Sequence, residues 1–452
     1  MPSWTRPRWK ARVSSATGPR GTAAPPPPSG RDSPSAIPCR CPVADPRLRV
    51  GVLFGGESPE HEVSLRSAKN VIEAIDRERW DIVLIGIDRR GRWHLADESR
   101  FLRHASDPRR IRLPDAPVRL ALTPGRRPRI VPVAPHDDAG PGGREGSGAG
   151  AGAGPTPAEL PELDVIFPVL HGPFGEDGTV QGLLRLAHLP FVGPGVLGSA
   201  VCMDKDVAKR LLRDAGVPVA PFITVLSRGE APSWDEAVSA LDAPIFVKPA
   251  NMGSSVGVSK VETDPEYRRA LDEAFAFDTK VLLERTIRGR EIELSVLGNE
   301  TPEASVPGEI APTHAFYSYE AKYLDHDGAD LLIPADLDAE TTARAREIAV
   351  RAFRVLCCEG MARVDLFLTT EACGPLPAGS LVVNEINTLP GFTRISMYPK
   401  LWEASGVSYP ELIDRLLRLA IERAERDARL ASAIDLQGGG EAGAGGGDGG
   451  SG

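Results

Sequence analysis

Two apolar segments near the carboxyl end of the chain carry carboxylates where buried strands are normally apolar. Residues 361–368 read Met-Ala-Arg-Val-Asp-Leu-Phe-Leu, and residues 381–387 read Leu-Val-Val-Asn-Glu-Ile-Asn. Burying a carboxylate without a partner is costly. Asp365, Glu385 and Asn387 offer only oxygen ligands, which suit Mg²⁺, while water and phosphates fill the remaining positions. The pattern therefore predicts a site for a hard cation on this pair of strands.

The spacing of the charged residues indicates whether both strands are buried. Glu385 and Asn387 are two residues apart, so they point to the same face of a strand. Arg363 and Asp365 repeat this spacing on the other strand. The alternative is a pair of edge strands with exposed acids, and the matched spacing favours the buried pair.

A glycine- and serine-rich segment follows the strand predicted at residues 243–247. It reads Lys-Pro-Ala-Asn-Met-Gly-Ser-Ser-Val-Gly-Val from Lys248, and its small residues let backbone N–H groups approach an anion closely. It is not a Walker A loop, because no Gly-Lys-Ser/Thr opens a helix. Another strand follows, so the segment predicts a glycine-rich β-hairpin over phosphates, with Lys248 adding positive charge. An ordinary hairpin loop is the alternative.

A second candidate nucleotide-binding segment covers residues 281–293. Its apolar strand ends on Glu284, a turn follows, and Glu291 supplies another acid. Such a segment can hydrogen-bond an adenine edge through its backbone and a ribose through Glu291. A charged turn between two strands is the alternative interpretation.

Two loops that follow predicted strands carry candidate ligands for a substrate. Residues 55–62 open a helix, whose free amides favour anions, and Glu60 could bind an ammonium group. Ser58 and Glu60 are alternatively helix-capping residues. His171 begins the second loop, and a lone His is more often structural. Ligands of open parallel sheets gather beyond the carboxyl ends of the strands, where both loops lie.

A polar stretch at residues 317–323 has few helix or strand signals but holds three Tyr and a Lys. This composition is typical of a lid that excludes water from a reaction. A solvated loop is the alternative.

The composition of the chain limits the classes of protein to which it can belong. The chain has 452 residues, a net charge of −9 and 25% charged residues, which is typical of a soluble globular protein with two or three domains. No apolar run approaches ~18 residues, so no membrane span is expected. The acidic balance argues against a nucleic-acid surface. The six Cys lack zinc-type spacing, and a reduced cytoplasmic protein is expected rather than a disulfide framework.

The alternation of strands and helices predicts an α/β fold in three blocks, with a parallel sheet in the first. Strands are predicted at residues 49–54, 82–87, 165–170, 222–225, 245–248, 281–284, 292–297, 363–368 and 381–386. Helices are predicted at 62–75, 180–187, 204–215, 339–356 and 410–426. The predicted divisions are a disordered extension at 1–47, an α/β domain at 48–200 with a flexible insertion at 136–158, a central domain at 201–295, a third domain at 296–430, and a disordered glycine-rich tail at 431–452.

Together these segments resemble the D-alanine–D-alanine ligases of the ATP-grasp superfamily. The resemblance covers residues 49–426, and its most specific segments are Lys-Pro-Ala-Asn-Met-Gly-Ser-Ser-Val-Gly-Val at 248–258, Tyr-Glu-Ala-Lys-Tyr at 319–323 and Asn-Glu-Ile-Asn-Thr-Leu-Pro-Gly-Phe-Thr at 384–393. It implies a three-domain ATP-grasp architecture with ATP held between the last two domains. It also implies two Mg²⁺ or Mn²⁺ ions, two D-alanines as substrates, and a homodimer that supplies the terminal dipeptide of peptidoglycan.

The resemblance also implies roles for the candidate residues. Contacts to ATP would come from Lys205, Lys248, Ser255, Glu284, Ile287 and Glu291. Metal ions would be held by Asp365, Glu385 and Asn387. The first D-alanine would meet Glu60 and His171, with Ser254 and Tyr323 linking the lid to that pocket. The oxyanion hole would be formed by Arg363 and the amide of Gly391. The remaining substrate contacts would come from Lys322, Ser396 and Met397.

Three other activities fit parts of this pattern. A D-alanine–D-lactate ligase would resemble the chain around residues 385–392 but typically carries a His-bearing lid. Another ATP-grasp enzyme, such as a carboxylase or a purine-pathway ligase, would share the metal-binding acids but not Tyr323 or residues 60–62. A regulatory nucleotide-binding protein would have lost catalysis. The argument against this last class is the intact set of Arg363, Asp365, Glu385 and Asn387.

Overall fold

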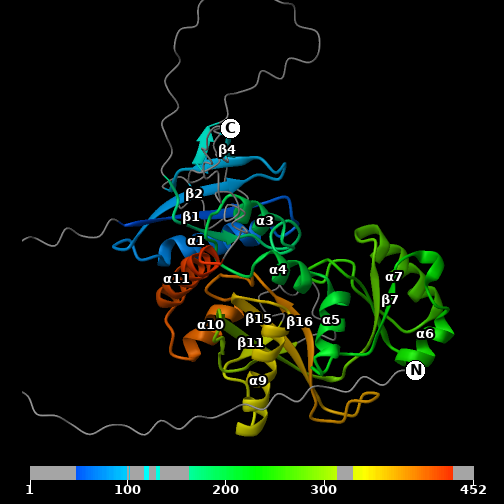
Figure 1. Cartoon of the computed structure of the whole chain (residues 1–452). Helices are drawn as coiled ribbons and strands as arrows, with labels where there is room; N and C mark the ends of the chain where they lie inside the picture. Colours follow the sequence, from blue (N-terminus) through cyan, green and yellow to red (C-terminus); the bar gives the residue numbers. More distant parts are fainter. Residues whose placement is uncertain are drawn as a thin grey trace, which may run out of the picture. The chain divides into compact units, whose positions relative to one another are not determined.

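The structure is a computed structural model that describes residues 47–98, 101, 117–121, 129–132, 162–312 and 329–430. The chain divides into two units, Met1–Pro46 and Arg47–Gly452, and all described residues belong to the second. The predicted extension up to residue 46, the insertion at 136–158, the lid and the glycine-rich tail lie outside the described residues. The second unit contains three β-sheets with helices packed on them, which confirms the predicted α/β class (Figure 1).

The first sheet joins a parallel half to an antiparallel half. Its strands are β1 (Leu48–Gly55), β2 (Trp80–Ile87), β3 (Trp93–Ala96), β4 (Pro117–Ala121), β5 (Arg129–Pro132) and β6 (Val165–Val169), in the order β5-β4-β3-β2-β1-β6. Strand β1 pairs in parallel with β2 and β6, as predicted, whereas β2 to β5 pair antiparallel. The near-continuous burial of β1 and β6 is typical of parallel strands covered on both faces. The helices that follow β1 and β6 are α1 (His61–Ala74) and α3 (Thr179–Leu186).

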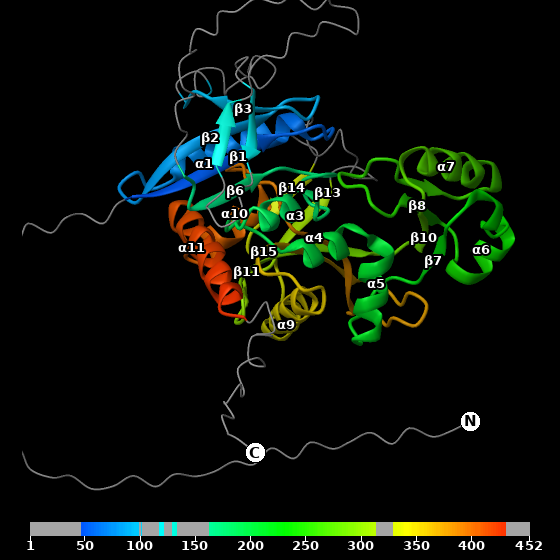
Figure 2. The ribbon, with the colours of Figure 1, turned by 45° about the horizontal axis from the view of Figure 1, so that its top comes forward.

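The second sheet is antiparallel and carries the glycine-rich segment. Its strands are β7 (Phe222–Val225), β8 (Ile245–Pro249), β9 (Ser259–Val261) and β10 (Val281–Arg285), in the order β7-β10-β8-β9. The predicted hairpin is confirmed, because β8 pairs antiparallel with β9. The helices α6 (Trp234–Leu241) and α7 (Asp264–Phe277) pack on this sheet through a shared apolar cluster (Figure 2).

The third sheet carries the two segments with buried acids. Its strands are β11 (Gly289–Gly298), β12 (Glu303–Ala304), β13 (Gly308–Pro312), β14 (Ala329–Leu332), β15 (Gly360–Thr369) and β16 (Leu381–Asn387). The main order is β14-β13-β11-β15-β16, and β12 pairs with β11. Helix α9 (Ala339–Val355) packs on one face. The boundary predicted at 295/296 falls inside β11, which pairs with β15 along its whole length.

Two short helices connect the first sheet to the second. They are α4 (Val196–Met203) and α5 (Lys205–Asp214), and Asp204 caps α5 by accepting from the amides of Asp206 and Val207. The Sγ atoms of Cys202 on α4 and Cys358 before β15 are 3.3 Å apart and buried, and both residues are free thiols. Two further short helical elements among the described residues are η2 (Arg228–Glu230) and α10 (Met397–Ala404).

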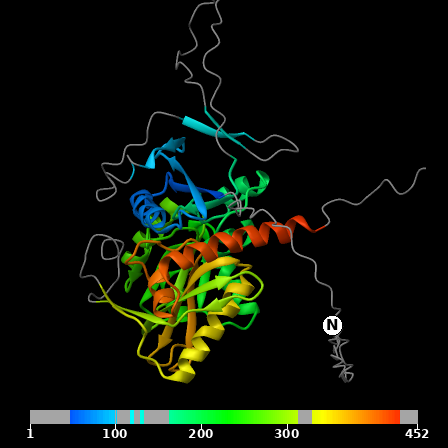
Figure 3. The same ribbon diagram turned by 90° about the vertical axis from the view of Figure 1, so that its left-hand side faces the viewer.

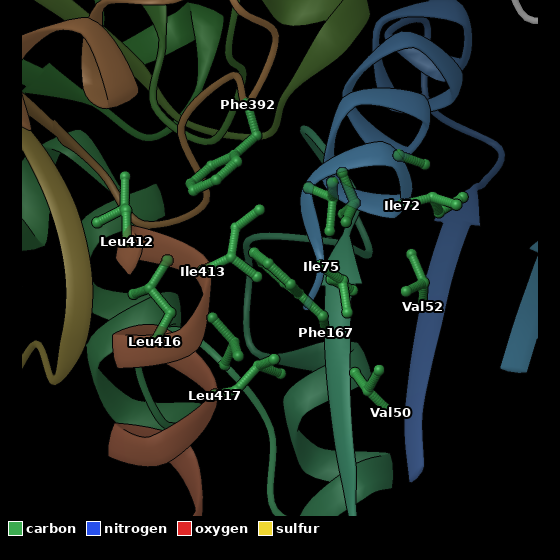
Figure 4. Close-up of a cluster of buried hydrophobic side chains, with 14 of the residues drawn as sticks. Val50, Val52, Ile72, Ile75, Phe167, Phe392, Leu412, Ile413, Leu416 and Leu417 are labelled. Atoms are coloured by element: carbon green, nitrogen blue, oxygen red, sulfur yellow. The ribbon is translucent and has the colours of Figure 1, made fainter. Parts of the chain in front are cut away.

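The last helix, α11 (Tyr409–Ala428), completes the core of the first sheet. Figure 3 shows it crossing between the first and third sheets. Its Leu412, Ile413, Leu416 and Leu417 are buried in one cluster with β1, α1 and β6, as the close-up in Figure 4 shows. Asp414 on the same helix accepts from Trp80 Nε1 at 3.2 Å. Residues predicted to lie in the first and third domains therefore share one hydrophobic core.

Among the described residues, no helix combines the length and apolar character that crossing a bilayer requires.

Candidate active site

Strands β15 and β16 bring together the charged and amide side chains predicted for this strand pair. The register pairs Arg363 with Asn387 and Asp365 with Glu385, and it shifts at a bulge immediately after Asp365. The neighbouring strand β11 adds Glu293 opposite Asp365. Three carboxylates therefore lie side by side across three strands. Like charges directly opposite each other are destabilising, so this row of acids requires positive charge nearby.

Arg363 supplies positive charge from within the protein. Its Nε lies 2.7 Å from Asp365 Oδ1 and 2.9 Å from Glu293 Oε2, and its Nη2 donates to Asp365 Oδ2 at 2.7 Å. Burial acts against the charge of the guanidinium, but the carboxylates of Asp365 and Glu293 outweigh it and raise the pKa of Arg363. The side chain is thus held charged and oriented by two acids.

The donor set beside Arg363 fits a hard cation. Asn387 Nδ2 donates to Asp365 Oδ2 at 2.9 Å, so its carbonyl oxygen is the ligand atom that this amide can offer. Within the part of the chain that the structure describes, no three His, Cys, Asp or Glu side chains form a complete metal site. Asp365, Glu385 and Asn387 are therefore an incomplete oxygen-ligand set, which is typical of Mg²⁺ sites that also use water and phosphates.

A buried charge cluster lies on the second sheet. Val247 packs against α6 and α7, so Lys248 at the next position points to the opposite face. Lys248 Nζ lies 2.6 Å from Glu284 Oε1, and Lys209 Nζ on α5 lies 2.7 Å from Glu284 Oε2. Burial raises the pKa of Glu284, but Lys209 and Lys248 outweigh burial and lower it. The glutamate is therefore ionised between two lysines.

Lys205 lies between this sheet and the row of acids. Its Nζ donates to the carbonyl oxygen of Met252 in the glycine-rich segment at 2.6 Å, and it lies 3.7 Å from Glu385 Oε2. A lysine predicted to bind phosphate thus stands between the predicted phosphate loop and a predicted metal ligand. This arrangement suits a group that carries several negative charges.

The other residues predicted to bind ATP lie around the same region. Ile287 is half-buried in the turn between β10 and β11, and Glu291 lies on β11 two residues before Glu293, so both acids share one face. Ser254 and Ser255 have φ of 51° and 61°. A left-handed residue other than glycine costs about 1–2 kcal/mol, and such strain clusters at functional sites.

The glycine-rich segment also contacts the loop that follows β1. Ser254 Oγ donates to Glu60 Oε1. Glu60 was predicted to hold the first D-alanine, and Ser254 was predicted to link the lid to that pocket. A Cβ atom on Gly172 would lie 2.7 Å from Glu60 Oε2, so the second predicted loop passes close to the same carboxylate. Three segments from different parts of the sequence therefore meet at Glu60.

His171 is held by protein atoms on both ring nitrogens. Its Nδ1 lies 2.9 Å from the carbonyl oxygen of Leu389, which can only accept, so Nδ1 carries the proton. Its Nε2 then accepts from Ser67 Oγ at 3.2 Å, and Ser67 Oγ accepts from the amide of Phe392 at 3.2 Å. Burial lowers the pKa of His171 although Glu60 acts against it, so the ring is neutral. In this structure His171 connects its loop to residues 389–392.

Glu176 connects the same two segments and was not assigned a role from the sequence. Its Oε2 accepts from the amide of Gly172 at 2.7 Å, and its Oε1 accepts from the amide of Leu389 at 3.1 Å. Burial, and then the nearby Glu60, raise the pKa of Glu176 to about 8. The carboxyl group thus joins the His171 loop to the segment that leads to Gly391.

We expect Glu176→Gln to change how stability depends on pH. The folded-state pKa of about 8 lies above the ordinary glutamate value of 4.5, so the stabilisation from the protonated carboxyl is fully present below about pH 4.5 and is lost as the pH rises through about 8. The free energy of unfolding of the natural protein, relative to Glu176→Gln, should therefore fall across this range. Urea unfolding of both proteins at several pH values measures it, and a constant difference would contradict the prediction.

The last group of predicted residues lies where β16 leads into α10. A Cβ atom on Gly391 would lie 3.0 Å from Ser396 Oγ, and Thr393 Oγ1 is 2.7 Å from the same hydroxyl. Met397 is buried in a small cluster with Ile310 and Leu401, so the structure packs its side chain into the core. Lys322 and Tyr323 lie outside the described residues.

Family models and curated relatives match most of this chain. The model for the D-ala D-ala ligase N-terminus matches residues 49–194, and that for the D-ala D-ala ligase C-terminus matches residues 211–418. D-alanine–D-alanine ligase A of Chromobacterium violaceum is 54% identical over 387 residues, which are 85% of this chain and 98% of the relative. D-alanine–D-alanine ligase A of Escherichia coli K12 is 51% identical over 389 residues, which are 86% of this chain and all of the relative.

Solved structures also resemble the fold. The D-alanine–D-alanine ligase from Coxiella burnetii has a TM-score of 0.68 and 38% identity, and the match covers 84% of this chain and 96% of that one. The VanG D-Ala:D-Ser ligase from Enterococcus faecalis has a TM-score of 0.68 and 34% identity, with 83% and 99% covered.

The fold places this protein in the ATP-grasp class of ligases. It has three β-sheets covered by helices, a glycine-rich hairpin and a row of acids on adjacent strands. Within this class, the chain belongs to the D-alanine–D-alanine ligase family.

Proposed function

We propose that this protein joins two D-alanine molecules into D-alanyl-D-alanine and converts ATP to ADP and phosphate, for the synthesis of peptidoglycan precursors. The observation that carries the proposal is that the glycine-rich segment predicted to bind the nucleotide contacts a residue predicted to bind D-alanine. Lys205 contacts both the glycine-rich segment and Glu385, while Ser254 of that segment contacts Glu60. A nucleotide phosphate and an amino acid can therefore lie next to each other, as phosphoryl transfer to a carboxylate requires.

The first step is attack by the carboxylate of one D-alanine on the γ-phosphorus of ATP. The bond to the bridging oxygen breaks, ADP leaves, and an acyl phosphate forms. Lys205 and Lys248 stabilise the phosphate charge, and Glu60 binds the ammonium group of this D-alanine. Phosphoryl transfer depends mainly on positioning and electrostatic stabilisation, which these partly buried side chains supply.

The second step is attack by the amine of the other D-alanine on the acyl carbonyl. A tetrahedral oxyanion forms, the attacking nitrogen passes a proton to the departing phosphate, and the C–O bond to phosphate breaks as the amide C–N bond is completed. Arg363 and the amide of Gly391 stabilise the oxyanion, and each such donor contributes about 3–4 kcal/mol. Glu293 and Asp365 keep Arg363 oriented for this task.

A divalent cation completes the proposed site. Asp365, Glu385 and Asn387 would hold two Mg²⁺ or Mn²⁺ ions, whose contribution when bound is to neutralise charge on the phosphates. We also infer three domains, with the boundary between the second and the third placed before β11 instead of at 295/296, so that this strand stays in the third sheet. We further infer a cytoplasmic location and a homodimer. Support for the dimer comes from Leu186 on α3 and Leu197 on α4, which are apolar yet 73% and 62% exposed.

The direct test is ADP release by the purified protein with ATP, Mg²⁺ and D-alanine, with L-alanine as the control and mass spectrometry of the product. We expect D-alanyl-D-alanine to form with D-alanine and no dipeptide to form with L-alanine. D-serine and D-lactate are included as second substrates, because a D-Ala:D-Ser ligase is among the similar structures. Preferential formation of a mixed product would assign a different acceptor. ATP binding without D-alanine-dependent turnover would contradict the proposed activity.

A further inference from the structure

Lys209 is a buried lysine for which the proposed reaction has no direct use. Its side chain lies on α5, one turn after Lys205, and the residue is only 1% exposed. Its ammonium group lies 2.7 Å from Glu284 Oε2, and Lys248 takes the other carboxylate oxygen at 2.6 Å. Burying an ammonium group costs free energy unless the group is paired, so a buried lysine at this position suggests a functional role.

The net charge of this cluster suggests what Lys209 contributes. Glu284 carries one negative charge and Lys248 one positive charge. Burial lowers the pKa of Lys209, but the Glu284 carboxylate acts against this shift and supports a second positive charge on Lys209. If Lys248 alone faced Glu284, the two would neutralise each other, and Lys248 would have little charge left for a phosphate. With Lys209 on Oε2, Glu284 is already neutralised, so Lys248 adds net positive charge at the mouth of the glycine-rich hairpin.

We propose that Lys209 is a positioning residue for the nucleotide, which acts through Glu284 and rests on the ATP-dependent function proposed above. It fixes the Glu284 carboxylate as an acceptor for the exocyclic amino group of adenine, and it leaves Lys248 for the phosphates. Guanine has a carbonyl oxygen at the corresponding position, which a carboxylate repels. Lys209 therefore contributes to the selection of ATP over GTP without touching the nucleotide.

The test compares Lys209→Met with the natural full-length chain. Methionine keeps an unbranched side chain of similar length and removes the charge. We expect the KM for ATP to rise at least tenfold and the preference for ATP over GTP in kcat/KM to fall at least tenfold. The KM for D-alanine and kcat at saturating ATP should stay within about threefold, because a purely structural defect would alter all four quantities together. Lys260→Met, on the exposed part of β9, is the matched control and should change none of them.

A double-mutant cycle with Glu284→Gln tests whether Lys209 acts through Glu284. Calorimetric titration with ADP and with GDP, in the absence of D-alanine, gives the base preference of each variant. We expect Lys209→Met to reduce this preference in the natural background and to have no further effect beside Glu284→Gln. In Lys209→Met, Glu284 keeps its ion pair with Lys248, so this variant leaves no buried unpaired acid and should fold.

Two outcomes would overturn the proposal. One is an unchanged ADP-over-GDP preference in folded Lys209→Met. The other is an equal loss of preference in both backgrounds, which would mean that Lys209 does not act through Glu284. Because these titrations need no ligase activity, they give a result even if the natural protein fails to form D-alanyl-D-alanine.

Discussion

Glu385→Gln should reduce kcat by roughly 10³-fold, since loss of a metal-held charge removes several kcal/mol of transition-state stabilisation. Glu385 lies opposite Asp365 on β16 and 3.7 Å from Lys205 Nζ. Glutamine keeps the size of the side chain but not the negative charge that would hold a divalent cation. The Mg²⁺ concentration needed for half-maximal ADP release should therefore rise at least about tenfold.

The effect should be on catalysis and not on folding. The side chain of Glu385 is 28% exposed, and partly exposed ion pairs contribute little to stability. Glu371→Gln is the matched control, because Glu371 lies just after β15 and pairs with Arg288 at the surface. Thermal unfolding should be similar for both variants. Activity within about fivefold of the natural protein, with unchanged Mg²⁺ dependence, would remove Glu385 from the metal site.

Leu417→Ala should lower the free energy of unfolding by about 2–5 kcal/mol, as is typical for a buried leucine whose loss leaves a cavity. Leu417 is 0% exposed and lies in the cluster that α11 shares with β1, α1 and β6. Trp80 and Trp402 belong to the same cluster, so tryptophan fluorescence during urea unfolding reports on it directly. The midpoint of that transition should shift to lower urea.

Leu430→Ala is the control for this prediction, because Leu430 follows the same helix but is 66% exposed. Its unfolding should match that of the natural protein within about 0.5 kcal/mol. If Leu417→Ala behaved like Leu430→Ala, the contact between α11 and the first sheet would not contribute to the stable core.

Elements with a clear apolar pattern could be predicted from the sequence. The predicted strand 222–225 coincides with β7, and β1, β10, β15 and β16 lie within a few residues of their predicted positions. Strands β3, β4 and β5 were missed, although β7 is equally short; β4 and β5 each contain a proline, which argues against a strand. Helices α6 and α7 were missed although both begin with a capping box, at Ser233 and Thr263, which was a readable signal.

In the candidate site, residues with a local sequence pattern could be predicted, and residues whose partners are distant in the sequence could not. The quartet of Arg363, Asp365, Glu385 and Asn387 was predicted because alternation along a strand fixes which side chains share a face. Glu293 and Glu176 were not assigned, since their partners are 70 and 213 residues away and no local pattern indicates them. Lys209 had a local signal, because it is four residues after Lys205 and so shares its helix face. Only the fold showed that both lysines point toward nucleotide-binding elements.

The contact between α11 and the first sheet has a consequence for synthesis on the ribosome. Strand β1 is among the first described elements to be made, and α11 follows roughly 350 residues later, which at about 5–20 residues per second takes on the order of 20–70 s. During this interval the side chains that β1, α1 and β6 contribute to the shared cluster lack their contacts with α11. Part of the first apolar core therefore stays accessible to solvent until α11 emerges.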